Sequence, residues 1–219
     1  EEAFKLGGKI EKEINDFYKE FIKKEYKRTS HLELQFEKCF IRFLMPKLRG
    51  SEKGAKKRYA GLVKNEKGKE EIMFTGMEAV RGDWTDAAKE FQYELLTKIF
   101  HKEEIFNFIK KFVRDLKEGK IDKKLIYKKS IRKELKDYTA ITPVHVKAAR
   151  KLDHLDSNII EYYITEDGPE PIQKLKHKID YDHYINKQIK PIADAILLFF
   201  NKNFDDMIKD SKQTKLFED

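Results

Sequence analysis

The sequence is poor in cysteine and has no long apolar run. The lone cysteine, Cys39, excludes an internal disulfide and fits a reducing compartment such as the cytoplasm. The longest apolar run, Ala195 to Phe200, has six residues, whereas a membrane-spanning helix needs roughly 20. The chain opens on Glu1 and Glu2, without an initiator methionine or the basic start of a signal peptide. We therefore expect a piece of a longer, non-membrane protein.

Two common enzyme signatures are missing as well. No glycine-rich phosphate loop ending in Gly-Lys-Ser/Thr occurs, and the six histidines never form His-Glu-x-x-His. His145 and His183 are therefore interpreted as ordinary helix residues rather than as metal ligands.

The composition indicates a packed, basic protein. The 219 residues include 40% hydrophobic and 12% aromatic side chains, which disordered chains lack. Lysine and arginine outnumber the acidic residues 47 to 39, so the formal net charge is +8. Such an excess suits a polyanionic partner, although charged helix faces exposed to water produce a similar composition.

The hydrophobic periodicity predicts an α+β fold. Strand-like alternation with turn residues dominates the first part, to about residue 87, and helical spacing of three and four dominates the rest. The predicted strands are 32–45, 57–63, 72–74 and 159–164. The predicted helices are 9–26, 85–99, 105–116, 143–151 and 191–204, with Thr85 as an N-cap.

The most distinctive local pattern is a basic cluster at the start of a predicted strand. Lys56, Lys57, Arg58 and Tyr59 precede Ala60 and Gly61. They could simply form a solvated strand end. Alternatively, a lysine held against the minor groove could test base pairing without reading sequence, because every correct pair presents acceptors there.

Several motifs in this order resemble family B DNA polymerases, and the polymerase II-like branch of bacteria in particular. The Lys-Lys-Arg-Tyr-Ala-Gly run resembles the signature of the palm domain in that family. Residues 76–84 resemble the segment between palm and thumb, although Gly82 stands where relatives often carry Arg or Thr. The other matching segments are 32–37, 143–149, 167–171 and 180–184.

This resemblance implies a division of the chain and a set of DNA contacts. Residues 1–87 would be the end of an antiparallel palm sheet, 88–208 a mainly helical thumb, and 209–219 a flexible tail. Lys57 would reach the minor groove of primer–template DNA. Arg58 and Tyr59 would hold the primer backbone, with Lys56 and Arg81 as supporting contacts. For Arg81 the alternative is a local ion pair with Asp83 that stabilises the domain junction.

The resemblance also implies where the reaction chemistry lies. Polymerases of this family use two metal ions, Mg²⁺ in the parent enzyme, bound by aspartates of an Asp-x-x-Ser-Leu-Tyr-Pro segment and an Asp-Thr-Asp turn. Neither motif occurs in this chain, so we expect it to be inactive alone. Glu37 would be a peripheral carboxylate near the metals, or else a solvated strand residue.

The C-terminal tail carries one more signal. Gln213, Leu216 and Phe217 match the Gln-x-x-Leu-Phe peptide with which the polymerase II-like branch binds the sliding clamp, although Thr214 stands where relatives often have Leu. The alternative is a chance apolar pair at a frayed end. The resemblance implies a monomer that acts on DNA in the bacterial cytoplasm.

Two other functions stay open at this point. The chain could be a stand-alone module that binds duplex DNA without sequence preference. It could also be a protein-interaction scaffold whose basic helices bind an acidic partner. Neither alternative requires a primer–template junction, so a preference for that junction separates both from a polymerase.

Overall fold

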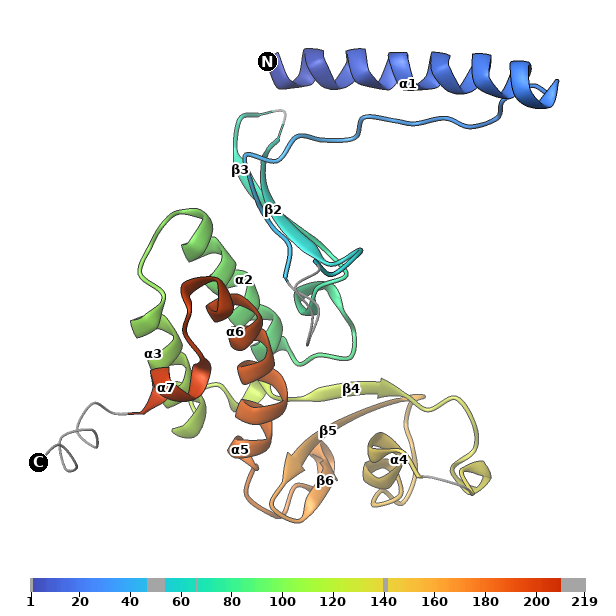
Figure 1. Cartoon of the computed structure of the whole chain (residues 1–219). Helices are drawn as coiled ribbons and strands as arrows, with labels where there is room; N and C mark the ends of the chain where they lie inside the picture. The colour runs from blue at the N-terminus through green and yellow to red at the C-terminus, as the bar shows by residue number, and fades with distance from the viewer. Residues whose placement is uncertain (1, 47–53, 66, 140–141, 210–219) are drawn as a thin grey trace, which may run out of the picture. The chain divides into compact units, whose positions relative to one another are not determined.

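The computed structural model describes residues 2–46, 54–65, 67–139 and 142–209 (Figure 1). The chain forms two compact units. Unit 1 comprises Glu1–Phe43 and Gly61–Met73, and unit 2 comprises Leu44–Ala60 and Phe74–Asp219. The division of the chain into palm and thumb after residue 87 stays a prediction.

Helix α1 (Glu2–Tyr26) dominates unit 1, and an extended segment runs beside it (Figure 1). The Asn15 side chain makes hydrogen bonds of 2.8 Å to both the backbone N–H and the carbonyl of Leu34. A carboxylate oxygen of Glu11 accepts from the Phe36 N–H at 2.8 Å. The predicted helix 9–26 is thus confirmed and begins earlier than expected.

The prediction of a continuous strand over 32–45 is wrong. Within the part of the chain that the structure describes, only β1 (Arg42–Leu44) is a strand in this range. Residues 32–40 are extended, but side chains of α1, rather than a neighbouring strand, supply their backbone partners. The alternating pattern therefore predicted the extended backbone correctly. It predicted a strand incorrectly, because a strand requires a second backbone beside it.

The predicted hairpin is confirmed. β2 (Tyr59–Lys64) and β3 (Glu70–Thr75) join β1 in a three-stranded sheet of order β1-β2-β3. The Asn65 side chain accepts from the N–H groups of Lys67 and Lys69 at 3.0 and 2.9 Å, and Gly68 has a φ of 75°. These are the turn residues that the sequence predicted.

Three helical segments build the core of unit 2. Helix α2 (Asp86–Phe100) begins at Thr85, whose hydroxyl accepts from the Ala88 N–H as predicted. Helix α3 (Phe106–Lys117) packs beside it (Figure 1). A third stretch runs without a break through α5 (Tyr181–Tyr184), the π-helix η5 (Ile185–Ile189), α6 (Lys190–Leu197) and the 3-10 turn η6 (Leu198–Phe200).

The last predicted helix, 191–204, extends too far. Asn201 has a φ of 53° and ends the stretch, because asparagine tolerates the left-handed conformation. A separate helix, α7 (Phe204–Ile208), follows, and the Asn203 side chain caps it by accepting from the Asp206 N–H. The short 3-10 turns elsewhere in unit 2 are η1 (Glu78–Val80), η2 (Asp122–Lys124), η3 (Leu135–Asp137) and η4 (Ile172–Lys174).

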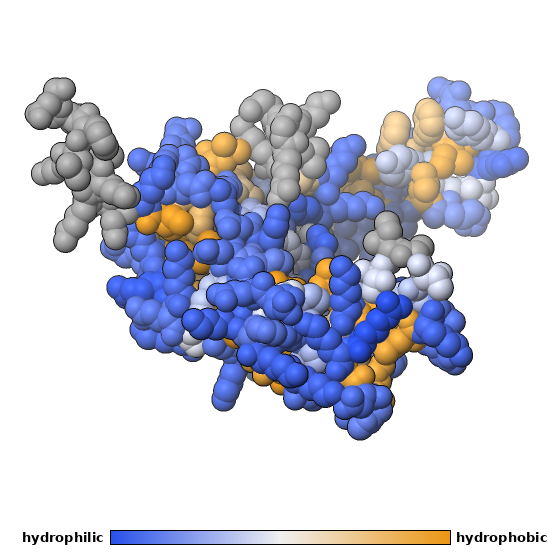
Figure 2. Space-filling view, turned by 90° about the horizontal axis from the view of Figure 1, so that it is seen from below, coloured by the Kyte–Doolittle hydropathy of each residue, from blue (hydrophilic) through white to orange (hydrophobic). Residues whose placement is uncertain are grey.

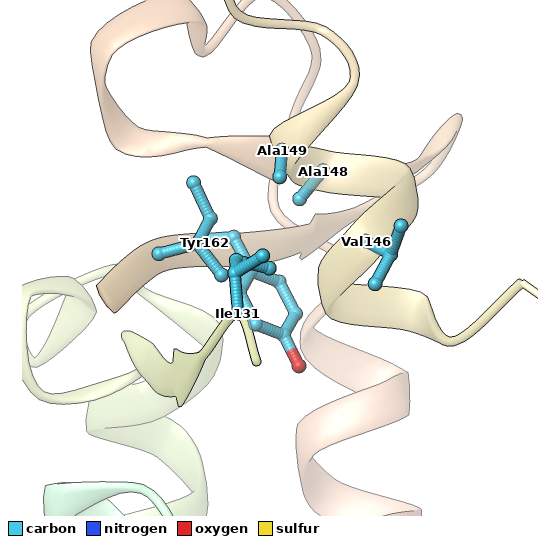
Figure 3. Packing of buried hydrophobic residues seen from close by; sticks show 6 residues of the cluster. Ile131, Val146, Ala148, Ala149 and Tyr162 are labelled. Atoms are coloured by element: carbon cyan, nitrogen blue, oxygen red, sulfur yellow. The ribbon is translucent and has the colours of Figure 1, made fainter. Parts of the chain in front are cut away.

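A second sheet lies in the part of the chain that was expected to be mainly helical. β4 (Tyr127–Ser130), β5 (Ile159–Thr165) and β6 (Gly168–Pro171) pair antiparallel, with Tyr127 opposite Tyr162. Helix α4 (Val144–Ala149) covers this sheet through the apolar cluster shown in Figure 3. The sequence predicted only its middle strand. The α+β fold class is confirmed.

A buried polar chain ties the second sheet to the helices. The Gln188 side chain of the π-helix accepts from the Thr85 hydroxyl at 2.8 Å and donates to the Tyr127 hydroxyl at 2.8 Å. That hydroxyl lies 3.1 Å from Nε2 of His183. Burial raises the pKa of Tyr127 and lowers that of His183, so both side chains stay neutral near pH 7. His183 thus has an ordinary partner, as the sequence suggested.

Glu170 is a buried carboxylate, 2% exposed, that holds the segment after β6. Its oxygens accept from the N–H groups of Lys176 and His177 at 2.8 and 3.1 Å and lie 2.6 Å from the His177 ring. Burial alone would raise the pKa of Glu170, but these hydrogen bonds together lower it from 4.5 to about 2. The ionised form is therefore the stable one in the folded state.

We expect Glu170→Gln to destabilise this hairpin by about 1–2 kcal/mol at neutral pH, because half-exposed His177 screens part of the full shift. Since the folded pKa lies below the unfolded one, the stabilisation is complete above pH 4.5 and is lost as the pH falls toward 2. The measurement is hydrogen exchange of the β5 and β6 amides in the variant and in the parent protein. The difference in protection between the two proteins should shrink below pH 4.5. Glu166→Gln, which replaces an exposed carboxylate, is the control and should show the same protection as the parent.

Figure 2 shows one face of the chain, on which hydrophobic residues gather in separate patches among hydrophilic ones. Among the described residues, no helix is both long and apolar enough to cross a membrane.

Candidate nucleic-acid interface

The predicted basic cluster lies on a turn that leads into β2. The Arg58 N–H donates to the Ala55 carbonyl at 3.3 Å and closes the turn. Lys56 and Lys57 occupy its two central positions and are exposed, and Lys57 has a φ of 60°. The sequence pattern placed Lys57 on the strand, which begins only at Tyr59. The lysines are thus presented by a tight turn instead of a strand face.

Arg58 points into a buried acidic site. Its guanidinium forms an ion pair with Glu78, which is only 8% exposed. The other oxygen of Glu78 accepts from the Gln92 side-chain amide at 2.7 Å. Gln92, on α2, also accepts from the Ala79 N–H at 2.6 Å. The basic turn is therefore connected to η1 and α2 by continuous polar contacts.

Arg81 pairs with Asp83, as the local alternative predicted. Two hydrogen bonds of 3.0 and 2.7 Å join the guanidinium to the carboxylate. They raise the pKa of Arg81 and lower that of Asp83. The positive charge of Lys129 on β4 also lowers the pKa of Asp83. The ion pair does not exclude a DNA contact, because both side chains are exposed.

A second basic run, which none of the sequence motifs singled out, begins in β4 and continues beyond it. It has five cations within nine residues: Lys128, Lys129, Arg132, Lys133 and Lys136. Ile131, in the middle of the run, is buried in the cluster of Figure 3 and fixes the run to the sheet. Arg132 and Lys133 are exposed and lie just before the 3-10 turn η3. The density of cations was the signal that could have identified it.

Arg150 holds the loop that carries this run. From the end of α4, its guanidinium donates to the carbonyls of Leu135 and Tyr138 at 2.9 and 3.0 Å. The Tyr138 hydroxyl in turn accepts from the Arg132 N–H at 3.2 Å. The loop thus has fixed anchor points, as a surface that must match a rigid partner requires.

Glu37 belongs to unit 1 and is not a member of the one group of possible metal ligands found among the described residues. Its side chain is 75% exposed and lies 3.7 Å from the ammonium group of Lys38. One exposed carboxylate beside a lysine does not form a two-metal site. The peripheral catalytic role of Glu37 stays a prediction.

One other group could offer metal ligands. Ligand atoms of Asp167, Glu170 and His177 lie within 4.8 Å of one another. However, the Lys151 ammonium group lies 3.4 Å from Glu170 and 3.8 Å from Asp167, so a positive charge already neighbours both carboxylates. Hard, oxygen-seeking Mg²⁺ does not fit a group with an imidazole and an ammonium. We therefore interpret it as the structural anchor of β6, and the residues present do not fit the metal pair of a polymerase.

The predicted clamp-binding residues Gln213, Leu216 and Phe217 lie outside the described residues. Lys56, Lys57 and Arg58 lie on one turn, and Tyr59 begins β2 directly after it. The charge of Lys129, in the basic run that begins in β4, acts on the Asp83 partner of Arg81. All of these cationic side chains belong to unit 2. Unit 2 thus presents two basic surfaces, each fixed by buried neighbours.

Comparison with known proteins identifies the family. The model of DNA polymerase family B matches residues 1–198. The chain is 39% identical over 215 residues to DNA polymerase II of Escherichia coli K12, which covers 93% of this chain and 27% of that relative. It is 32% identical to DNA polymerase 2 of Aeropyrum pernix over 67% of this chain and 20% of the relative. It is 34% identical to the DNA polymerase of Thermococcus litoralis over 84% of this chain and 11% of that relative.

The chain therefore spans no more than about a quarter of the length of these relatives. The motif-based prediction of a polymerase II-like sequence is confirmed by the extent of the match, which covers both units. This chain belongs to DNA polymerase family B.

Proposed function

We propose that this chain is the DNA-gripping C-terminal part of a DNA-directed DNA polymerase, which binds primer–template duplex and positions the primer end during replication or repair synthesis. The observation that carries the proposal is the exposed Lys56–Lys57 turn at the head of β2, anchored through Arg58. Lys57 would donate to minor-groove acceptors, which all correct base pairs share. Tyr59 and Arg58 would contact the primer backbone, supported by Lys56 and Arg81.

The basic run after β4 extends this proposed surface. Lys129, Arg132 and Lys133 would contact phosphates of the duplex, which fix the register of the protein without reading sequence. We place the full-length protein in the bacterial cytoplasm on nucleoid DNA, as a monomer. Its tail would bind the sliding clamp through Gln213, Leu216 and Phe217.

The reaction itself would take place on residues outside this chain. When bound there, Mg²⁺ ions would activate the primer hydroxyl and stabilise the leaving pyrophosphate. The residues of this chain would hold the duplex and orient the primer end.

Salt dependence tests the proposed phosphate contacts. The slope of log K against log salt is negative, and each phosphate that a variant no longer neutralises reduces its magnitude by about 0.9. Arg132→Ala/Lys133→Ala in the full-length protein should therefore reduce the magnitude by about 2. The measurement is a primer–template titration at several salt concentrations. Lys110→Ala/Lys117→Ala removes two exposed cations of α3, which Figure 1 draws on the opposite side of unit 2 from α4, and should leave the slope unchanged. An unchanged slope in the first variant would show that the basic run is a solvated surface that does not contact phosphates.

The chain alone, with Mg²⁺, primer–template and all four nucleotides, should extend no primer. The reason is that neither aspartate motif of the family occurs in its sequence. Gel analysis of labelled primer, with a sample purified in parallel from cells lacking the gene as the control, measures this. Templated extension above that control would disprove the assignment of the chemistry to other residues.

A titration with two DNA ligands separates the alternatives. A stand-alone duplex-binding module should bind blunt duplex and primer–template junctions equally. A scaffold for an acidic protein should bind both weakly. We expect the full-length protein to prefer the junction.

A further inference from the structure

The turn that presents Lys56 and Lys57 is held in a conformation that its own residues disfavour. Lys57 has a φ of 60°, in the left-handed region that is unfavourable for residues with a Cβ atom. Within the described residues, the turn is closed by one long backbone hydrogen bond of 3.3 Å, from Arg58 to Ala55. Such a conformation persists only where the surroundings impose it. The contacts around the turn therefore determine where the Lys57 side chain is presented.

Gly76 is the first of these contacts. A Cβ atom on Gly76 would lie 2.2 Å from the Lys57 carbonyl oxygen, and Gly76 itself has a φ of 59°. Only glycine allows the backbone of residue 57 to approach so closely without strain. The backbone of Gly76 thus forms a wall against which the turn rests.

The Arg58–Glu78 pair is the second contact. Both carboxylate oxygens of Glu78 are used, one by Arg58 and the other by Gln92. Gln92 is 1% exposed and is itself fixed by the Ala79 N–H. The Nε atom of Arg58 is buried and has no hydrogen-bond partner among the described residues, so the ion pair with Glu78 is the polar contact that holds the guanidinium. A buried carboxylate with a fixed second partner holds the arginine, and hence the turn, in one place.

We propose that Glu78, supported by Gln92, is a positioning residue that fixes the basic turn through Arg58 and so sets the place of the Lys57 ammonium group on the primer terminus. The proposal rests on the proposed DNA contact of Lys57. It assigns to Arg58 a role as the anchor of the turn in addition to any contact with the primer backbone. Glu78 acts through Arg58 and touches no substrate.

Removing the charge of Glu78 separates positioning from general electrostatics. If Glu78 were only a negative charge near DNA, Glu78→Gln would reduce repulsion of phosphates and tighten DNA binding. If Glu78 positions the turn, the variant keeps its amide contact to Gln92 but releases Arg58, so the primer end is held less accurately. The affinity for duplex should then change little, and the rate of extension should fall.

The experiment is single-turnover primer extension by the full-length protein at saturating primer–template. The burst amplitude reports the folded, active fraction, and the rate constant reports positioning. We expect Glu78→Gln to lower the rate on a matched primer by about 10-fold, with a near-normal amplitude, and to reduce discrimination against a mismatched terminus. Glu90→Gln removes a carboxylate that is paired with Lys124 on the exposed face of α2 and is the matched control.

A second variant changes the other contact of the same turn, the close approach of Gly76 to the Lys57 backbone. Gly76→Ala should displace the Lys57 backbone and produce the same loss of rate, whereas nothing lies within 4 Å of a Cβ atom added at Gly82, so Gly82→Ala should be normal. If Glu78→Gln lowers the burst amplitude so far that no rate constant can be measured, the rate constant of Gly76→Ala is used to test the proposal instead. Hydrogen exchange should show reduced protection in residues 55–60 and unchanged protection in α2.

Three results would overturn the proposal: a normal rate in Glu78→Gln, a normal rate in Gly76→Ala, or a loss confined to the amplitude, which would make the network structural only. Lys57→Ala distinguishes this failure from that of the proposed function. If Lys57→Ala extends primers normally, the DNA contact itself is wrong. If Lys57→Ala is slow while Glu78→Gln is normal, only the positioning role is refuted.

Discussion

Lys57→Ala in the full-length protein should slow extension of a matched primer by roughly 10- to 100-fold and reduce discrimination against a mismatched terminus. Loss of one donor to the minor groove removes about 1–3 kcal/mol. A mismatch displaces the acceptors that the lysine contacts, so the parent protein should lose this energy on mismatched ends already, and the variant should lose little more there. The measurement is single-turnover extension on matched and mismatched primers.

Alanine is the right replacement because the backbone conformation of residue 57 is unfavourable for any residue with a Cβ atom. Lysine and alanine share this cost, so the variant removes the ammonium group without relaxing the turn. Lys64→Ala, at the exposed far end of β2, is the matched control and should behave as the parent protein. Equal rates for Lys57→Ala and the parent on both primers would contradict the assignment of the turn.

Replacing both Leu216 and Phe217 by alanine should abolish binding of the tail to the sliding clamp of the same organism. Burial of the two side chains in apolar pockets contributes roughly 1.5–3 kcal/mol each before ordering costs. Ordering the peptide offsets a substantial part, so a peptide of residues 212–219 should bind with micromolar affinity. Removing both side chains leaves only the polar contact of Gln213. The measurement is a calorimetric titration of the peptide against the clamp.

Two further peptides bracket this prediction. Thr214→Leu adds an apolar side chain where relatives often have one, and should tighten binding by about 10-fold. Lys215→Ala keeps the apolar pair and should bind nearly as well as the parent peptide. If the parent peptide shows no saturable binding up to about 1 mM, or if the double variant of the full-length protein unfolds at a lower temperature, the clamp proposal is wrong.

Local pattern was a good guide wherever neighbours in sequence supply the stabilising contacts. The cap at Thr85, the turn at Asn65 and the helical faces of α1 to α3 depend on residues within about four positions of each other. Each of these predictions is confirmed. The α+β class follows from them, because the two periodicities occupy different parts of the chain.

Predictions failed where the partner lies far along the chain. Residues 32–40 have the alternation of a strand, but their hydrogen-bond partners are Glu11 and Asn15 of a helix. β4 and β6 are short and polar, and they become strands because β5 lies between them. One failure had a local cause: Asn201, in the left-handed conformation, ended a helix that apolar residues alone would have continued to residue 204.

The sequence by itself determined the family of this protein and the residue types of its candidate interface, since motifs and charge are local properties that can be read without coordinates. Only the tertiary structure decided how those residues are used. It placed Lys57 on a strained turn, paired Arg58 with a glutamate 20 positions away, and brought Lys129 of β4 within electrostatic reach of Asp83. The physical reason is that an ion pair or a close backbone approach depends on which segments pack together, and packing of distant segments is a property of the whole fold.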